Sequence, residues 1–206
     1  MPDHLYETHI FSGTGITDIT VPEGTTAVGS FADCTKLTSI TFPEGVKALS
    51  DFSGCSSLRA IDIPDGVSVI GLGLFEHCTK LTKVTIPSSV VSLGSFAFHE
   101  CSSLTHIVIP NHVATIGGFA FADCPLTSVT LGSGVTSIEE SAFHNAPIRQ
   151  LRCYAVVPPK LPGVVNGSFS ADLVKGATLY VPAGTGMAYS ESDWKIYFEN
   201  IVEMEE

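Results

Sequence analysis

The stretch LTHIVIPNHVATIGGFAFADC, residues 104–124, decides the fold, because the chain repeats it with small changes along most of its length. Its opening, Leu104-Thr-His-Ile107-Val-Ile109-Pro110, alternates apolar and polar residues and ends at a proline. Related segments begin at Ile16, Leu37, Leu58, Leu81, Leu126 and, with more changes, Ile148. A unit of 21 to 23 residues that recurs about seven times predicts a solenoid in which each unit forms one coil.

Each coil is expected to contain one short parallel strand, with side chains such as Ile107 pointing inward and their neighbours pointing outward. Proline ends the strand because it lacks the N–H that a longer ladder needs, and pairs such as Glu44-Gly45 then favour a turn. A second apolar set follows in each unit, as in Val113, Ile116, Phe119 and Phe121. One coil cannot bury these residues alone, but stacking at about 4.8 Å per strand makes a continuous core.

Both ends of such a stack need covers, and the sequence offers them within a single domain of residues 1–206. Residues 1–15 are expected to form a partial entering coil from about His9, with Ile10 in its core, and residues 16–153 the repeats. Residues 154–206 are expected to form a degenerate coil at Leu179-Tyr-Val-Pro182, a short helix within 184–189 and a cover that includes Trp194 and Ile201.

Composition excludes several classes of function. The formal net charge of −11 opposes binding to nucleic acid or anionic lipid, since those partners reward clusters of Lys and Arg. No apolar run reaches the roughly 18 residues that would cross a bilayer, so we expect no membrane insertion.

The repeated pattern Leu-x-x-Ile-x-Ile-Pro, then Val-x-x-Ile-Gly, then Ala-Phe-x-x-Cys resembles the leucine-rich repeats of the BspA type, known from surface proteins of Bacteroides and related bacteria. Its clearest instance runs from Leu104 to Cys124, and the ending from Cys153 to Ile201 resembles the caps of those proteins. The resemblance implies a mainly β leucine-rich-repeat solenoid of about seven coils, with one parallel sheet, short 3-10 or irregular convex segments and a C-terminal cap with a short helix. It also implies an extracellular or cell-surface location and a broad role in adhesion, but no binding residues.

Five cysteines occupy one column of the repeat, while Cys153 falls at an inward strand position; the column holds Cys34, Cys55, Cys78, Cys101 and Cys124. Zinc sites use close pairs of cysteines, whereas these lie at least 21 residues apart and would form a line. Disulfides between neighbouring coils fit poorly, because parallel Cβ atoms about 4.8 Å apart exceed the usual separation. We therefore expect a ladder of reduced, buried thiols and no metal there.

Histidines and acids next to this column raise the question of catalysis. His77, His99 and His144 are neighbours of the cysteines, and His99-Glu100-Cys101 together with His106 invites a hydrolase or metal interpretation. No nucleophile elbow, His-Glu-x-x-His helix or phosphate-binding loop accompanies them. We expect surface histidines, no enzyme activity and no cofactor, and we expect the row Asp33, Glu100, Asp123 and Asn145 to form solvated turns without calcium.

The outward-facing strand positions remain as the candidate binding surface. The C-terminal half of this row offers long and chemically varied side chains, where we predict contact: Lys83, Thr85, His106, Val108, Ser128, Thr130, Gln150 and Arg152. We predict a monomeric, non-catalytic module that binds a host or matrix protein, with glycan binding or a structural spacer in a larger surface protein as alternatives.

Overall fold

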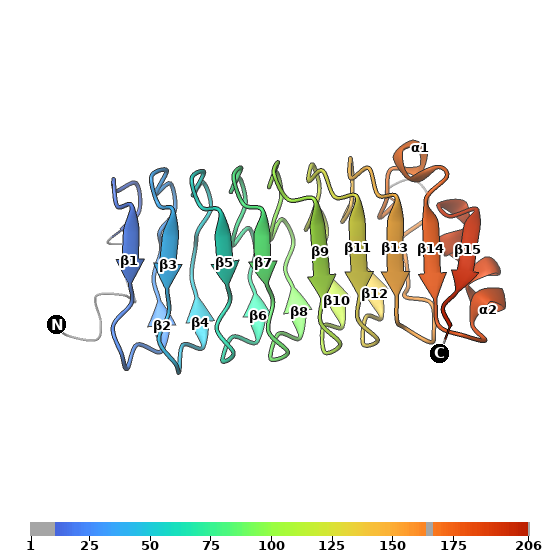
Figure 1. Ribbon diagram of the computed structural model, residues 1–206, viewed down its shortest axis with the longest axis horizontal. Helices are drawn as coiled ribbons and strands as arrows, with labels where there is room; N and C mark the ends of the chain where they lie inside the picture. The colour runs from blue at the N-terminus through green and yellow to red at the C-terminus, as the bar shows by residue number, and fades with distance from the viewer. Residues whose placement is uncertain (1–10, 164–166, 206) are drawn as a thin grey trace.

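In the computed structural model, which describes residues 11–163 and 167–205, the chain winds into an elongated solenoid of about eight turns (Figure 1). One face is a row of parallel strands in chain order. The row consists of β1 (Asp18–Thr20), β3 (Ser39–Thr41), β5 (Ala60–Asp62), β7 (Lys83–Thr85), β9 (His106–Ile109), β11 (Ser128–Leu131), β13 (Gln150–Cys153), β14 (Thr178–Val181) and β15 (Asn200–Glu203). The predicted fold class is confirmed.

Strand pairing follows the repeat, so that equivalent residues lie opposite one another. Ile107 of β9 pairs in register with Val129 of β11, which in turn pairs with Leu151 of β13, and all three are buried. Hydrogen-bonded pairing runs continuously from β9 to β15 and joins β1 to β3 and β5 to β7, while the remaining neighbours lie side by side without a ladder. The alternation in the sequence therefore sets which side chains enter the core.

A second, shorter set of strands was not expected from the sequence. It consists of β2 (Ala27–Val28), β4 (Ala48–Leu49), β6 (Val69–Ile70), β8 (Ser92–Leu93), β10 (Thr115–Ile116) and β12 (Ser137–Ile138). β2 pairs with β4, and β6, β8, β10 and β12 form a parallel sheet, both within the second apolar segment of the unit. The reason is geometric: when coils of nearly equal length stack, their equivalent backbone groups come within pairing distance there as well.

The core is built from columns of identical residue types. Seven described phenylalanines stack from coil to coil with ring centroids 4.8 to 5.6 Å apart: Phe11, Phe31, Phe52, Phe75, Phe98, Phe121 and Phe143. Phe169 continues this column into the cap. Phe119, expected with this inner set, is instead only half-buried and stacks on Phe96.

The residue before each column cysteine adopts a left-handed backbone conformation, and this explains the residue types found there. Positive φ angles of 57 to 60° occur at Asp33, His77, Glu100 and Asp123, and Gly54 has φ of 70°. Asn145, which precedes Ala146 in the same column, has φ of 57°. Asp, Asn, His and Gly tolerate this region better than most residues. The turn therefore favours Asp33, His77, Asp123 and Asn145, whereas Glu100 adopts the same conformation without this preference.

The C-terminal cap contains α1 (Ala171–Val174), α2 (Gly186–Ser190) and the 3-10 helix η3 (Asp193–Ile196). Trp194 is fully buried, and its indole N–H donates to the Pro159 carbonyl at 2.8 Å, in agreement with its expected covering role. Ile201 was expected to cover the last coil as part of the cap, but it lies in β15 and pairs in register with Leu179. The cap thus extends the sheet and gives the β14 edge a hydrogen-bonded partner.

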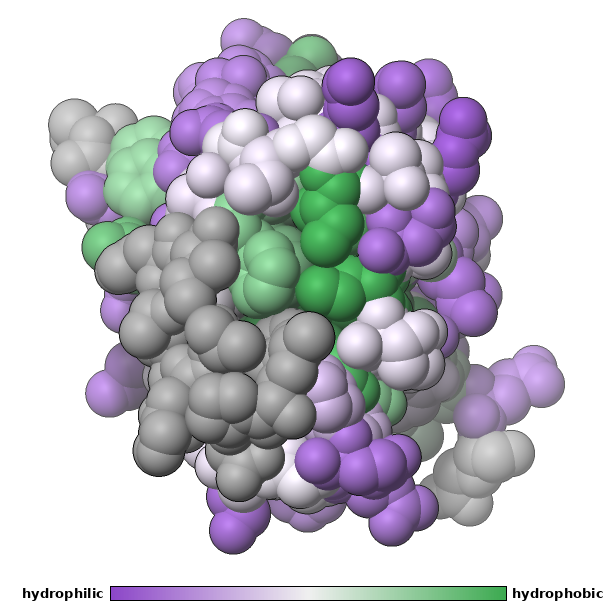
Figure 2. Space-filling model, turned by 90° about the vertical axis from the view of Figure 1, so that its left-hand side faces the viewer, coloured by the Kyte–Doolittle hydropathy of each residue, from purple (hydrophilic) through white to green (hydrophobic). Residues whose placement is uncertain are grey.

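At the N-terminal end, seen face on in Figure 2, apolar side chains gather within a polar rim. Phe11, Ile16 and Ile19 are partly buried and pack against the core, and the Gly13 N–H donates to the Ala32 carbonyl at 2.7 Å. His9 and Ile10, with which the entering coil was predicted to begin, lie outside the described residues. The division of residues 1–206 into one domain with these caps stays a prediction.

Candidate binding surface

The eight residues predicted to make contact all lie on the outer face of neighbouring strands β7, β9, β11 and β13. We call this surface the outer strip: Lys83, Thr85, His106, Val108, Ser128, Thr130, Gln150 and Arg152. Its β9 to β13 part forms two rows in register, His106-Ser128-Gln150 and Val108-Thr130-Arg152. Ser128, Thr130 and Arg152 are half-buried, whereas the other five are exposed.

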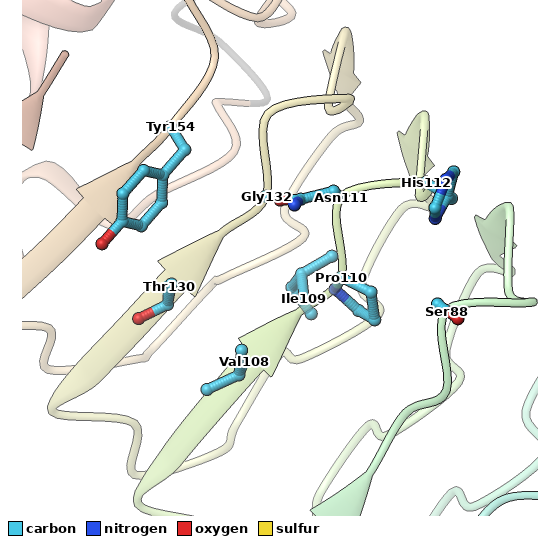
Figure 3. A pocket seen from close by; sticks show the side chains of 9 residues that line it. All are labelled: Ser88, Val108, Ile109, Pro110, Asn111, His112, Thr130, Gly132 and Tyr154. Carbon is cyan, nitrogen blue, oxygen red and sulfur yellow. The ribbon is translucent and has the colours of Figure 1, made fainter.

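A shallow groove of about 480 Å³ borders the strip at the carboxyl ends of its strands (Figure 3). Val108 and Thr130 form one side of it, and Asn111 and Tyr154 come from the segments that follow β9 and β13. Val108 is 60% exposed and Tyr154 is 45% exposed. The groove thus combines an accessible aliphatic side chain and an aromatic ring with hydrogen-bonding groups, a composition suited to recognition.

Thr85 does not line this groove. It borders a second groove of about 670 Å³ together with Thr41 and Asp62, and its hydroxyl donates to the Asp62 carboxylate at 2.5 Å. The hydrogen-bonding capacity of Thr85 is therefore partly used within the protein.

Two aromatic residues at this surface, Tyr154 and Tyr180, were not predicted from the sequence to belong to it. Tyr180 of β14 pairs in register with Arg152, whose guanidinium carbon lies 4.9 Å from the centre of the Tyr180 ring. Such a cation–π contact restrains the arginine on the surface. The repeat could have predicted this position of Tyr180. Leu179-Tyr-Val-Pro182 matches Ile107-Val-Ile-Pro110, which places Tyr180 in the column of Val108.

Charge is unevenly distributed along the outer sheet. At its N-terminal end, Asp18 accepts hydrogen bonds from Ser39 at 2.6 Å and from Thr38 at 3.0 Å, and these bonds lower the pKa of its carboxyl group. Further along, Lys83 and Arg152 add positive charge, and neither forms an ion pair with a carboxylate of residues 11–163 or 167–205. An acidic group of a partner would therefore be attracted to the outer strip.

The six cysteines are free and buried, and the prediction that the column thiols are buried is confirmed. Each column thiol donates a hydrogen bond to a backbone carbonyl of the preceding coil, for example Cys78 to Phe52 at 3.2 Å and Cys101 to Phe75 at 3.2 Å. Desolvation raises the pKa of the Cys78 thiol to about 12. These thiols tie coils together, and the raised pKa opposes a role as nucleophiles.

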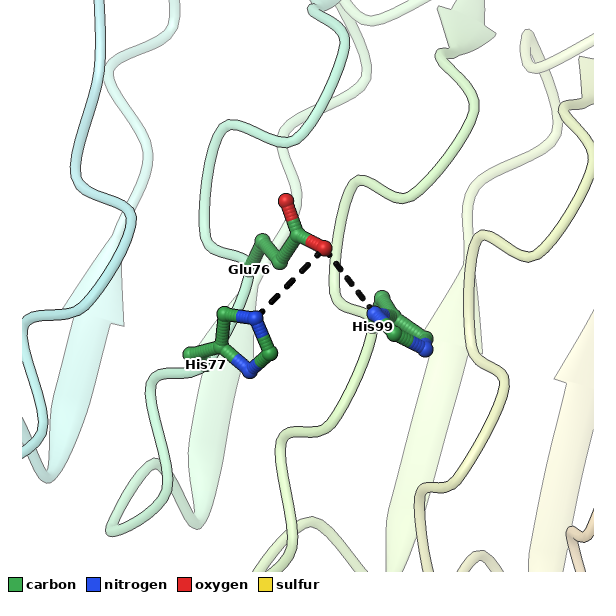
Figure 4. A group of neighbouring side chains, drawn as sticks. All are labelled: Glu76, His77 and His99. Atoms are coloured by element: carbon green, nitrogen blue, oxygen red, sulfur yellow. Dashed lines mark hydrogen bonds and ion pairs between the residues drawn. The ribbon is translucent and has the colours of Figure 1, made fainter.

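The histidines next to the cysteine column are not all simple surface residues. The side chain of His99 is only 17% exposed, whereas that of His77 is 49% exposed. Both meet Glu76, which was not singled out from the sequence (Figure 4). His106 lies apart from this group, on the outer strip, and His144 is exposed and close to the Ser170 hydroxyl.

The parallel strand row, the phenylalanine column and the repeat period together define a leucine-rich-repeat solenoid. The sequence matches the family model described as BspA type leucine rich repeat region, in six copies over residues 6–53 and 29–149, and the chain belongs to this family. Solenoids of this kind are generally protein-interaction modules without catalytic activity. Within the described residues, no helix has the length and apolar character needed to cross a bilayer.

Two solved structures share this fold. The leucine rich repeat protein of T. pallidum is 30% identical, with a TM-score of 0.64, and the match covers 70% of this chain and 72% of that chain. The pneumococcal vaccine antigen PcpA is 15% identical, with a TM-score of 0.55, and the match covers 97% of this chain and 71% of that chain. No curated protein matches the chain significantly.

Proposed function

We propose that this protein is a non-catalytic, extracellular or cell-surface module of a bacterium that binds another protein through the outer strip. The observation that carries the proposal is the combination of the exposed Val108, the bordering groove with Tyr154 and the cations Lys83 and Arg152 on one strand face. Aromatic and arginine side chains are enriched where binding energy concentrates. Membership of the BspA-type family supports the location and the interaction role.

The partner is expected to present an extended segment that carries at least one carboxylate. The strands of the strip together with β14 are spaced about 4.8 Å apart, which gives a surface about 19 Å long. A segment laid across them would bring its carboxylate to Lys83 or Arg152 and an apolar side chain to the groove at Val108. The flat face and the shallow groove favour such a segment over a compact small molecule.

Glycan binding is a second candidate, and one observation favours it. The exposed ring of Tyr154 and the amide of Asn111 border the same groove, and an aromatic face beside an amide suits a sugar ring. Binding to immobilised glycans that is lost in Tyr154→Ser, while capture of proteins is absent, would support this alternative.

The test begins with a pull-down of host-surface and matrix proteins by the purified chain, followed by titration of the captured partner. Changing Lys83, His106 and Arg152 together to Ser should raise Kd at least about ten-fold, equivalent to about 1.4 kcal/mol. The melting temperature should change little, because exposed polar substitutions usually shift stability by less than about 0.5 kcal/mol.

A matched control likewise removes two cations and one histidine, at positions elsewhere on the surface. Lys36, Lys47 and His144 are exposed and lie outside the strip, so changing these three to Ser alters the net charge equally. The control variant should bind like the parent. Equal binding by the strip variant and the parent would overturn the proposal, and a chain that captures no partner in any form would favour the spacer role.

A further inference from the structure

Glu76, His77 and His99 bring three potential metal ligands together in the turns before Cys78 and Cys101, apart from the outer strip (Figure 4). Each of the three residues offers one ligand atom, and these atoms lie within 4.8 Å of one another. The Glu76 Oε1 atom is 3.0 Å from His99 Nδ1 and 3.7 Å from His77 Nε2. Zinc bonds of about 2.1 Å in a tetrahedron place neighbouring ligand atoms about 3.4 Å apart, and the two distances lie on either side of this value.

The other nitrogen of each imidazole faces a carboxylate of its own. His77 Nδ1 lies 3.1 Å from Glu100 Oε2, and His99 Nε2 lies 3.5 Å from Asp123 Oδ2. Metal-binding histidines characteristically donate the second ring N–H to a carboxylate, which fixes the tautomer and strengthens the ligand. Both histidines of the cluster therefore have one nitrogen toward Glu76 and the other toward an orienting acid.

The backbone holds this arrangement in place. The His77 N–H donates to the His99 carbonyl at 2.8 Å, which joins the two coils that carry the ligands. His77 and Glu100 both have φ of 57°, so their side chains leave neighbouring coils from the same kind of turn. The ring of Phe96 packs edge-on against His99, with centroids 5.4 Å apart. Ligands held by a repeated, hydrogen-bonded turn need little reorganisation to bind an ion.

We propose that Glu76, His77 and His99 form a binding site for one divalent transition-metal ion of the zinc class, with water completing the coordination. Two imidazole nitrogens favour such ions over Mg²⁺ and Ca²⁺, which prefer oxygen ligands in larger number. Three surrounding carboxylates, Glu76, Glu100 and Asp123, favour a dication electrostatically. The ion would link two neighbouring coils, independently of whether the outer strip binds a partner.

The test is calorimetric titration of the full chain, without a histidine tag, with ZnCl₂. The parent should bind one equivalent of Zn²⁺ and should not bind Mg²⁺ or Ca²⁺. Glu76→Gln and His77→Asn should each weaken binding by at least about ten-fold, and Glu100→Gln and Asp123→Asn, which alter only the orienting acids, by about ten-fold. His144→Asn is the matched control, because His144 occupies the same column as His99 two coils further on, and it should bind like the parent.

Two further measurements separate this site from binding to cysteine. Co²⁺ at the site should give visible d–d bands without the near-ultraviolet charge-transfer band of cobalt–thiolate bonds. Zn²⁺ should raise the melting temperature of the parent but not of His77→Asn, because Asn tolerates the φ of 57° at this half-exposed position and leaves the fold intact by circular dichroism. Absence of Zn²⁺ binding, equal binding by Glu76→Gln, or a thiolate signature would each overturn the proposal.

Discussion

At the scale of single residues, the structure assigns each column of the repeat a physical role. Inward strand residues and phenylalanines fill the core, the cysteine closes the turn, and the residue before it adopts a left-handed conformation. A repeat position therefore keeps the same residue type from coil to coil only where packing or backbone conformation restricts it. The outward strand positions vary most, since only solvent and neighbouring side chains constrain them.

The core assignment predicts large losses on truncation. Ile107→Ala should lower the free energy of unfolding by about 2–5 kcal/mol and Phe121→Ala by about 3–5 kcal/mol, because coils packed on both sides cannot collapse around the cavity. Urea unfolding measures both losses. Val108→Ala is the control, since this side chain is 60% exposed, and should change stability by less than about 0.5 kcal/mol. Losses below about 1 kcal/mol at Ile107 and Phe121 would contradict the assignment.

At the scale of elements, the thiol ladder and the turns do more than fill space. Cys55, Cys78, Cys101 and Cys124 each donate to a phenylalanine carbonyl of the preceding coil, at 3.0 to 3.2 Å. A valine of similar size would fill the same space but has no side-chain group that could donate a hydrogen bond to this carbonyl. Cysteine thus adds a bond between neighbouring coils at a position where the strands themselves make none.

Thiol reactivity tests the ladder. The native chain should show no thiol that reacts with an aromatic disulfide reagent, whereas denaturation without reductant should expose all six. Burial blocks the reagent, and a pKa of about 12 at Cys78 leaves roughly one thiolate in ten thousand at pH 8. A total below six after denaturation without reductant would show that disulfides exist.

At the scale of the whole molecule, stability depends on contacts between neighbouring coils and on the caps. Each coil buries its apolar residues only against the coils beside it, so an exposed end weakens the whole stack. The C-terminal cap closes one end with Tyr189, Trp194 and Phe198, all fully buried. The Tyr189 hydroxyl donates to the Ala155 carbonyl at 2.8 Å and thereby joins the cap to the segment after β13.

Removal of the central cap residue should therefore unfold the C-terminal coils first. Trp194→Ala should cost about 3–5 kcal/mol, since it leaves a large cavity and removes the indole bond to Pro159. Hydrogen exchange should show loss of protection in β13, β14 and β15 before β3 and β5. Met187→Ala, at a side chain 75% exposed, is the control. Uniform loss of protection along the chain would indicate that the solenoid unfolds as one unit.

Much of this architecture was predictable because a repeat converts sequence position into spatial position. The inward and outward assignments within the strand row, the buried cysteine column and the covering role of Trp194 agree with the structure, whereas Phe119 was wrongly placed in the inner set. The second set of short strands was missed, because two-residue segments have no periodicity to detect: β2, β4, β6, β8, β10 and β12. β15 was missed because it has a single inward apolar residue, Ile201, and one such residue is equally compatible with a strand and with an irregular cap.

The sequence by itself determined the solenoid, its strand row and the residues of the outer strip, since the period of the repeat and the alternation within each strand are local properties. Only the tertiary structure decided which side chains of neighbouring coils meet at the turns. Glu76 and His99 share a column 23 residues apart, yet their contact with His77 depends on backbone and side-chain torsions that no pattern of residue types specifies. The same holds for Arg152 and Tyr180, which meet because the cap adds β14 to the sheet at a break in the period.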